Sequence, residues 1–304
     1  MAASITTGKA WSSGYAMLRP SNLPVPIFLI VWSGMVLLPL IVIVGFSFLQ
    51  VKSYRVVYEP TLDTWQSVIS SGRWLSAVRT LRVGITMTVV ELLLAFPFAL
   101  WLAKGCKSKT VKALIITLLT IPFFLDTSSR LIVWRSILGT NGTVNTILMW
   151  LGVIDQPIDW LLYSEFAVHF GMIGSYFPTM VFPIFMILTL VDDDYIQASS
   201  DLGASPGQTL LYVILPLSLP GIVDGVVFTL VPLMAAFAEP QMLGGGFVNL
   251  LGNSVNSALQ ELKYPTAAAL STIVVALLGL CLATLIATTR HRIDMATMFQ
   301  AIKR

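Results

Sequence analysis

Long uncharged apolar stretches alternate with short polar segments along the chain. No charge occurs between Arg19 and Lys52, and residues 26–49 lie in this interval. A helix rises ~1.5 Å per residue, so this stretch is long enough to cross a hydrocarbon core of ~30 Å. Similar stretches follow. The pattern predicts an all-α, polytopic membrane protein with six transmembrane helices, at about residues 26–49, 78–103, 111–138, 166–190, 221–243 and 266–289.

Two regions depart from a simple spanning pattern. The third predicted span is the least regular, because Asp126, Arg130 and Arg135 interrupt its second half. Residues 202–223 carry no charge but contain three prolines and several glycines. A lipid-exposed backbone broken that often would leave amide groups unpaired. We therefore expect two short helices against the membrane face there, and a fifth span that begins near Gly221.

Composition supports a membrane protein and excludes several other classes. Of the 304 residues, 56% are apolar and 11% are charged, whereas soluble domains average about 25% charged residues. A net charge of +3 gives no reason to expect a nucleic-acid partner. No GxxxxGK[ST] loop is present, so any nucleotide energy must come from a partner. Two cysteines and two histidines, without ligand spacing, predict no metal site and no cofactor in this chain.

The distribution of Lys and Arg predicts the orientation. Ten of these residues fall in segments 1–25, 104–112 and 290–304, and four fall in the connectors on the other side. Basic residues favour the cytoplasmic side of short loops. We expect both termini to be cytoplasmic, with an N-terminal segment 1–25, a transmembrane domain 26–289 and a tail 290–304.

The loop after the fourth span, residues 192–220, carries the most specific motif. Its blocks are Gln197-Ala198-Ser199, Leu202-Gly203-Ala204 and Ile214-Leu215-Pro216. These resemble the EAA loop of binding-protein-dependent ABC importer permeases, which reads Glu-Ala-Ala, two residues, Leu-Gly-Ala, about ten residues and Leu-Pro. Gln197 and Ser199 depart from the family pattern. A neutral amide in place of the usual Glu would weaken a charge-assisted contact to an ATPase by about half.

The residues of this loop suit a short rigid helix that contacts another protein and transmits its motion to the spans. Asp192–Asp194 precede a short helix, whose free amides and dipole favour acidic side chains. Small residues allow close approach of a partner, and a glycine can end the helix. The alternative is a solvated polar turn between two helices. Such a turn would not need the uncharged, apolar residues that follow the motif. The resemblance implies ATPase coupling through Tyr195, Gln197, Ala198, Ser199, Leu202, Gly203, Ala204 and Pro216.

Other stretches resemble the spermidine/putrescine branch of these permeases. They are residues 121–124, 150–158, 215–221 and 242–246, within a core of about 78–289. The resemblance implies a type I ABC importer permease fold in a bacterial inner membrane. It also implies a second homologous permease subunit, two copies of a cytoplasmic ATPase that bind ATP and Mg²⁺, and an external solute-binding protein. The implied solute is a polyamine or a similar small organic molecule; an opine or amino-acid derivative is the alternative.

Carboxylates inside predicted spans are candidates for the substrate path. A charge at mid-helix costs ~2.5–3.5 kcal/mol on insertion scales, so each suggests an internal partner or a wet cavity. With aromatic neighbours such as Phe237 or Trp134, carboxylates could hold a polycation. The candidates are Glu91, Asp126, Asp224 and Glu239.

Structural roles compete with this interpretation. Glu91 or Asp224 could instead pair with an arginine in a structural bridge, the candidates being Arg79, Arg82, Arg130 and Arg135. Asp224 could also serve subunit packing, because it lies between Gly221 and Gly225, which have GxxxG spacing. His169 is more simply a buried, hydrogen-bonded imidazole than a proton relay.

Two further functional classes remain open on the sequence. A stand-alone secondary transporter or channel could use Glu91, Asp224 and Glu239 as an ion relay. It would have no use for the coupling loop, and no internal inverted repeat is evident. A membrane scaffold or sensor would need a soluble signalling domain, and no polar segment is long enough for one.

Overall fold

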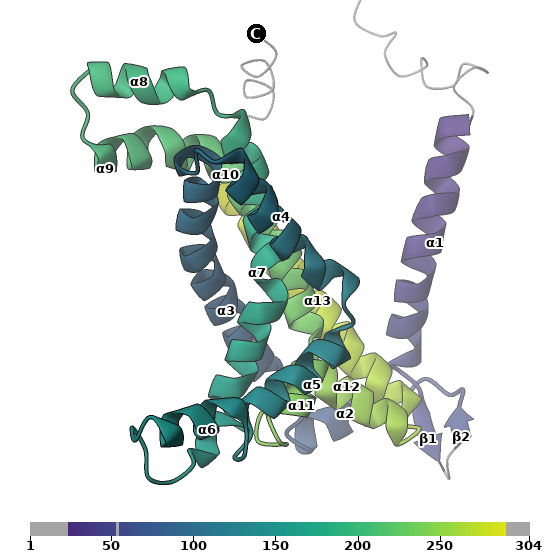
Figure 1. Ribbon diagram of the computed structural model, residues 1–304. Coiled ribbons are helices and arrows are strands. Elements are labelled where there is room, and N and C mark those ends of the chain that lie inside the picture. Colours follow the sequence, from purple (N-terminus) through teal and green to yellow (C-terminus); the bar gives the residue numbers. More distant parts are fainter. Residues whose placement is uncertain (1–23, 53–54, 290–304) are drawn as a thin grey trace, which may run out of the picture.

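The computed structural model describes residues 24–52 and 55–289, and most of this chain is helical (Figure 1). Five described helices are long and apolar enough to cross a membrane, or six if one bent pair counts as a span. Most of the predicted segment 1–25 and all of the tail 290–304 lie outside the described residues. Four spans are α1 (Pro24–Phe46), α3 (Trp74–Leu100) with the π-helical turn η3 (Trp101–Gly105), α7 (Glu165–Leu190) and α13 (Tyr264–Thr289).

The third predicted span is sharply broken. Helix α4 (Lys109–Phe124) is followed, after two residues, by α5 (Thr127–Leu138), and the bend is 105°. Leu125 and Asp126 are extended, and the Asp126 side chain accepts hydrogen bonds from the amides of Ser128 and Ser129. This N-cap starts a new helix. The predicted irregularity is confirmed, but a single helix to Leu138 is wrong.

The fifth span begins earlier and ends earlier than expected. A continuous helical segment of 30 residues runs from Pro206 to Ala235, comprising α9 (Pro206–Thr209), the π-helical turn η5 (Leu210–Ile214) and α10 (Leu215–Ala235). The expected short helices before the span are present, because α9 and η5 lie beside α8 (Asp193–Asp201) at the end of the bundle (Figure 1). The expected start of the span at Gly221 is wrong, because α10 begins at Leu215 and its prolines are accommodated. Pro206 occupies the first turn, where its missing amide costs nothing, and the π turn supplies a Leu215-to-Leu210 bond just before Pro216.

The same span does not reach Leu243. Ala236 is extended after α10, and α11 (Ala238–Leu243) is a separate short helix. The chain therefore contains two discontinuous passages, at Leu125–Asp126 and at Ala236–Phe237. Non-helical backbone at membrane depth is tolerated only where protein or a water-filled cavity surrounds it.

Short elements gather at the end of the bundle opposite α8 (Asp193–Asp201) and α9 (Figure 1). All of them except α11 lie in the connectors that the sequence predicts outside the membrane, and α11 falls at the end of the predicted fifth span. Near α1 lies an antiparallel hairpin that pairs Val51 with Val56. These elements are β1 (Gln50–Lys52), β2 (Arg55–Val57), α2 (Asp63–Ser70), α6 (Thr143–Trp150), η4 (Asp159–Leu161), α11 and α12 (Leu251–Gln260).

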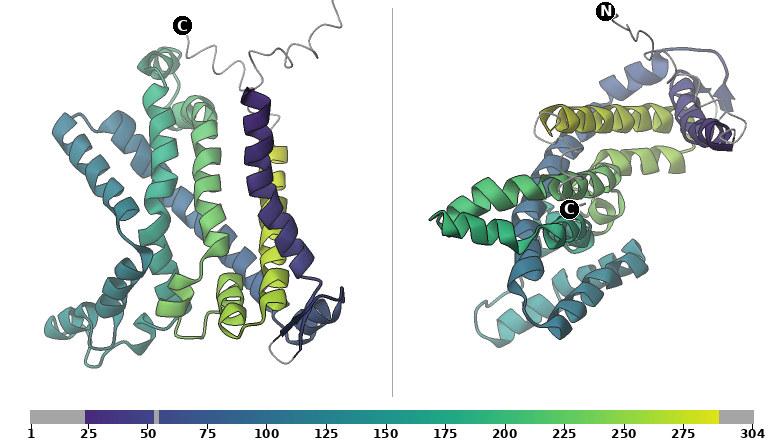
Figure 2. Two further views of the ribbon diagram at one scale, coloured as in Figure 1. Left: turned by 90° about the vertical axis from the view of Figure 1, so that its right-hand side faces the viewer. Right: turned by 90° about the horizontal axis from the view of Figure 1, so that it is seen from above.

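Helix α7 is the centre of the packing. It contacts α10 and α3 more extensively than any other pair of elements meets, and it also touches α4, α5, α11 and η3. Figure 2 shows α1, by contrast, at the margin beside α13. Three apolar clusters fill the interior of the described chain. One surrounds Met87 and Met172 towards the connectors, one surrounds Ala99 and Ile184 towards α8, and the third surrounds Leu270 between α2, α12 and α13.

Gly221 and Gly225 pack α10 against α7 within the chain. A Cβ atom at Gly221 would lie 2.7 Å from the carbonyl oxygen of Pro183, and one at Gly225 would lie 3.0 Å from that of Met180. The small pair therefore serves intrachain packing.

We predict that Gly221→Ala destabilises the protein by about 1–3 kcal/mol, because its methyl group would collide with backbone rather than with a flexible side chain. Thermal unfolding in detergent measures this. Gly279→Ala on α13 is the matched control, since nothing lies within 4 Å of its Cβ position. Equal melting temperatures for the two variants would contradict the packing role.

Candidate functional site

The predicted coupling motif folds as a helical hairpin that projects from the end of the bundle (Figure 1). None of the nine residues of α8 is buried. Asp192 caps α8 by accepting a hydrogen bond from the Asp194 amide, and Asp193 and Asp194 lie in the first turn. The expected acidic start of this helix is confirmed.

The turn between α8 and α9 is exposed at its tip, and hydrogen bonds join the two helices on either side of it. Leu202 is 89% exposed, and Gly203 adopts a φ of +81° with open space at its Cβ position. At the base, the Ser199 and Thr209 hydroxyls are 2.9 Å apart, and Ser205 forms a reciprocal capping box with α9. The hairpin is therefore braced while its apolar tip remains free.

The other predicted coupling residues have mixed accessibility. Tyr195, Gln197, Ala198 and Pro216 are exposed, and Ser199 and Ala204 are half-buried.

Lys104, in the π-helical turn η3 at the end of α3, binds the start of this hairpin. The Lys104 ammonium group donates to the carbonyl oxygen of Val191 at 2.5 Å and to Oδ1 of Asp193 at 2.6 Å. In the sequence, Lys104 is one of the basic residues that indicate the cytoplasmic side of the membrane, and nothing there indicates a partner for it. Nothing in the sequence pairs residues so far apart, so this contact requires the structure.

Two of the candidate carboxylates are fully enclosed. Glu91 on α3 is 0% exposed and Glu239 on α11 is 1% exposed. Both carboxylate oxygens of Glu91, and Oε1 of Glu239, make no hydrogen bond to any described residue. Buried groups of this kind are costly unless another molecule or another arrangement of the helices satisfies them.

Arg130 and Tyr176 complete what we call the buried polar cluster: Glu91, Arg130, Tyr176 and Glu239. Tyr176 lies next to Glu239 and within the electrostatic reach of Arg130 and Glu91. The Nε and Nη1 atoms of Arg130 are also buried without a partner in the described chain. The cluster joins α3, α5, α7 and α11, and α5 and α11 each directly follow a helix break. The role of Tyr176 could not be predicted, because an isolated tyrosine in an apolar span carries no signal in the sequence.

The expected structural bridges are not formed. The ion pairs of the described residues are Arg73–Glu261, Arg82–Glu165, Lys104–Asp193 and Lys263–Glu261, and none includes Glu91 or Asp224.

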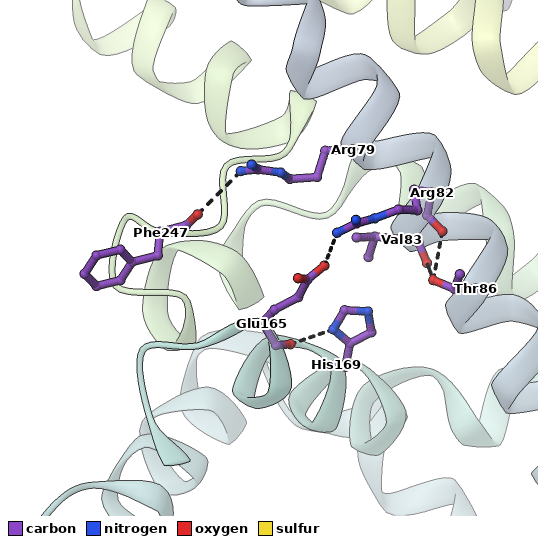
Figure 3. A network of polar contacts seen from close by, with 7 residues as sticks. All are labelled: Arg79, Arg82, Val83, Thr86, Glu165, His169 and Phe247. Carbon is purple, nitrogen blue, oxygen red and sulfur yellow. Dashed lines mark hydrogen bonds and ion pairs between the residues drawn. The ribbon is translucent and has the colours of Figure 1, made fainter. Parts of the chain in front are cut away.

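The arginines in the first turns of α3 have other partners (Figure 3). Arg82 pairs with Glu165 at the start of α7, and Arg79 donates to the carbonyl oxygen of Phe247 at 3.4 Å. The His169 Nδ1 lies 2.5 Å from the carbonyl oxygen of Glu165. The imidazole is therefore hydrogen-bonded as expected, but it is half-buried rather than buried.

Asp126 and Asp224 lie apart from the cluster. Asp126 is exposed, and its carboxylate is used as the cap of α5. Asp224 is exposed on α10, well inside the 30-residue span, and Phe228, one turn further along, is 62% exposed. The four sequence candidates thus divide into a buried pair, a helix cap and a carboxylate on an open helix face.

Burial raises the pKa of Glu239 above its ordinary value of 4.5, although its backbone amide, Tyr176 and Arg130 oppose this. As pH rises above 4.5, the unfolded carboxyl group ionises while the folded one keeps its proton, so stability must fall. We predict that Glu239→Gln increases thermal stability relative to the native chain, and that the difference grows as pH rises above 4.5.

The exposed Glu261 gives a control of opposite sign. Its pKa is lowered, first by the hydrogen bond from Lys263, so its contribution to stability is present above 4.5 and is lost as pH falls. Glu261→Gln should therefore decrease stability at neutral pH. A pH-independent effect of Glu239→Gln would contradict the account of its burial.

Comparisons with known proteins agree with this architecture. Residues 95–294 match the family described as binding-protein-dependent transport system inner membrane component. The spermidine/putrescine transport system permease protein PotB of Escherichia coli K12 is 32% identical over 251 residues, covering 81% of this chain and 90% of that protein. A putative 2-aminoethylphosphonate transport system permease protein, PhnU of Salmonella typhimurium LT2, is 30% identical and covers 72% of this chain and 77% of its own.

A solved structure shares the fold. A chain of a bacterial alginate ABC transporter, crystallised with an alginate pentasaccharide-bound periplasmic protein, superimposes with a TM-score of 0.68 at 16% identity. The match covers 91% of this chain and 97% of that chain. The expected fold is therefore confirmed, and the stand-alone transporter and the sensor are set aside. The chain belongs to the binding-protein-dependent inner membrane components and is the permease of an ABC importer.

Proposed function

We propose that this permease forms half of the path for a polyamine or a similar cationic organic solute. A second homologous permease subunit supplies the other half, and an external solute-binding protein delivers the solute. The names of the PotB relatives support this solute class. The name of the PhnU relative refers to an aminophosphonate, which carries both an amine and an anionic group. An opine or amino-acid derivative shares these two groups and is the second candidate.

The exposed carboxylate of Asp224 carries the proposal. An ionised side chain on a lipid-facing surface at mid-span costs ~2.5–3.5 kcal/mol on insertion scales. Asp224 has no ion-pair partner in the described chain that would offset this cost. Its helix face therefore suits water and a cationic solute rather than lipid. The exposed ring of Phe228 adds a surface for cation–π contact.

The buried polar cluster suits a later stage of the same passage. Glu91 and Glu239 are closed off in this conformation, so a solute would reach them only after α5 or α11 moves. Each of these helices follows an extended segment that interrupts the helical backbone, where a shift of the helix needs few dihedral changes. Once such a movement exposes them to water, the two carboxyl groups can ionise, and two carboxylates against one arginine would favour a polycation over an anion.

We further propose that two cytoplasmic ATPase subunits hydrolyse ATP and drive the cycle through the α8–α9 hairpin. The hairpin lies at the same end of the bundle as the start of α1 and the end of α13 (Figure 1). This arrangement, with the Lys and Arg bias, supports cytoplasmic termini. The exposed tip at Leu202 offers an apolar contact for the ATPase.

For the hairpin, we predict that Gly203→Asp abolishes co-purification of the ATPase while membrane insertion stays intact, because a charge would replace open space at the tip. Gly246→Asp is the matched control. Its glycine also has a positive φ, +86°, and an open Cβ position, but it lies at the opposite end. An undiminished ATPase complex with Gly203→Asp would count against the docking site.

For the path, we predict that Asp224→Asn raises the apparent KM for polyamine uptake about tenfold, the effect of losing one charge-assisted contact. The yield of the complex should not change. Asp155→Asn, an exposed carboxylate in the outer connector, should leave uptake unaltered. Native uptake kinetics in Asp224→Asn would remove this residue from the path.

A further inference from the structure

We propose that Lys104 is a positioning residue that transmits movement of α8 into α3. The proposal rests on the proposed function, in which the ATPase moves the α8–α9 hairpin. Lys104 occupies the π-helical turn η3 at the end of α3. Its side chain is only 19% exposed, although an ammonium group is normally well hydrated.

The two acceptors of Lys104 lie on either side of the joint between α7 and α8. Val191 is the C-cap residue of α7, where a free carbonyl oxygen and the helix dipole favour a cation. Asp193 begins α8. One ammonium group therefore binds the last carbonyl of one helix and the first carboxylate of the next. If α8 moved without α3, a shielded cation would lose its acceptors.

The remaining attachments of α8 do not reach α3 through a polar contact of this kind. Ile196 packs against the apolar cluster around Ile184, and Ser199 binds Thr209 of α9. That cluster includes Ala95 and Ala99 of α3, so apolar packing also joins the hairpin to α3. Lys104 adds hydrogen bonds, which depend on the direction between donor and acceptor.

Helix α3 leads from Lys104 to the buried polar cluster. Glu91 lies thirteen residues earlier on the same continuous span, or about 20 Å along a helix axis at ~1.5 Å per residue. A displacement at Lys104 thus reaches a carboxylate that is buried without a hydrogen-bond partner in the described chain. A movement that gave this carboxylate a hydrogen-bond partner would stabilise it.

The helix ends beside the hairpin are suited to bending. In η3 the amide of Cys106 bonds to the carbonyl oxygen of Trp101 at 2.8 Å, and η5 lies between α9 and α10. π-Helical turns are rare and often occur at functional sites. Here one contains Lys104, and the other leads into the helix that carries Asp224.

The test measures solute transported per ATP hydrolysed by the complete complex in proteoliposomes, with spermidine as the probe. Lys104→Met should lower this ratio about tenfold, as expected for loss of a charge-assisted contact, while the ATPase still co-purifies. Lys104→Arg should retain most of the coupling. Lys107→Met removes an equal charge from an exposed site three residues away and should behave as the native chain.

An unchanged ratio in a normally assembled Lys104→Met complex would overturn the proposal. If that variant does not assemble, Asp193→Asn decides the matter, because Asp193 is 69% exposed and its loss leaves the Val191 contact in place. Asp193→Asn should lower the ratio by a smaller factor, and an unchanged ratio would again contradict the role. Failure of the native chain to capture any ATPase would instead reject the proposed function.

Discussion

Close packing of α3 and α10 against α7 is the constraint on which the rest of the structure depends. In hydrocarbon there is no hydrophobic force between helices, so close approach and satisfied backbone groups must hold the bundle together. Gly221 and Gly225 permit that approach along α10. Because α7 continues almost directly into α8, the same packed core also fixes where the coupling hairpin emerges.

The charges of the chain are arranged around this core according to depth. Pairs such as Arg82–Glu165 tie the outer helix ends together, and Lys104 ties the opposite ends. Between them lie two carboxylates on the spans that have no ion-pair partner among the described residues, namely the buried Glu91 and the open Asp224. Unpaired charges at depth are expensive, and in an importer permease they are natural places for a passing solute and for a change of conformation.

The sequence predicted the outline of the fold for clear physical reasons. Uncharged stretches of spanning length must form helices in lipid, and the spacing of the EAA-like motif located the coupling hairpin. The errors came where proline was treated as a breaker. Pro206 and Pro216 are accommodated by a helix start and by a π turn, and neither device has a reliable sequence signature. The fifth span was therefore placed too late.

The candidate site was less accessible to sequence reasoning because it is made by tertiary contacts. Glu91 and Glu239 could be identified as candidates because each is a carboxylate in an apolar stretch. The sequence could not show that Tyr176 and Arg130 lie beside them in the fold. Nor could it separate Asp126, which caps a helix, from Asp224, which stands on an open face. Burial and partners distinguish these residues, and both depend on how distant segments of the chain meet.

The central claim is that this chain moves a cationic solute only as part of an ATP-driven complex. The most direct measurement is spermidine uptake into liposomes that contain the permease with its second subunit, the ATPase and the binding protein, each omitted in turn. We expect uptake only when ATP and every component are present. Uptake by this chain alone, without nucleotide, would contradict the account.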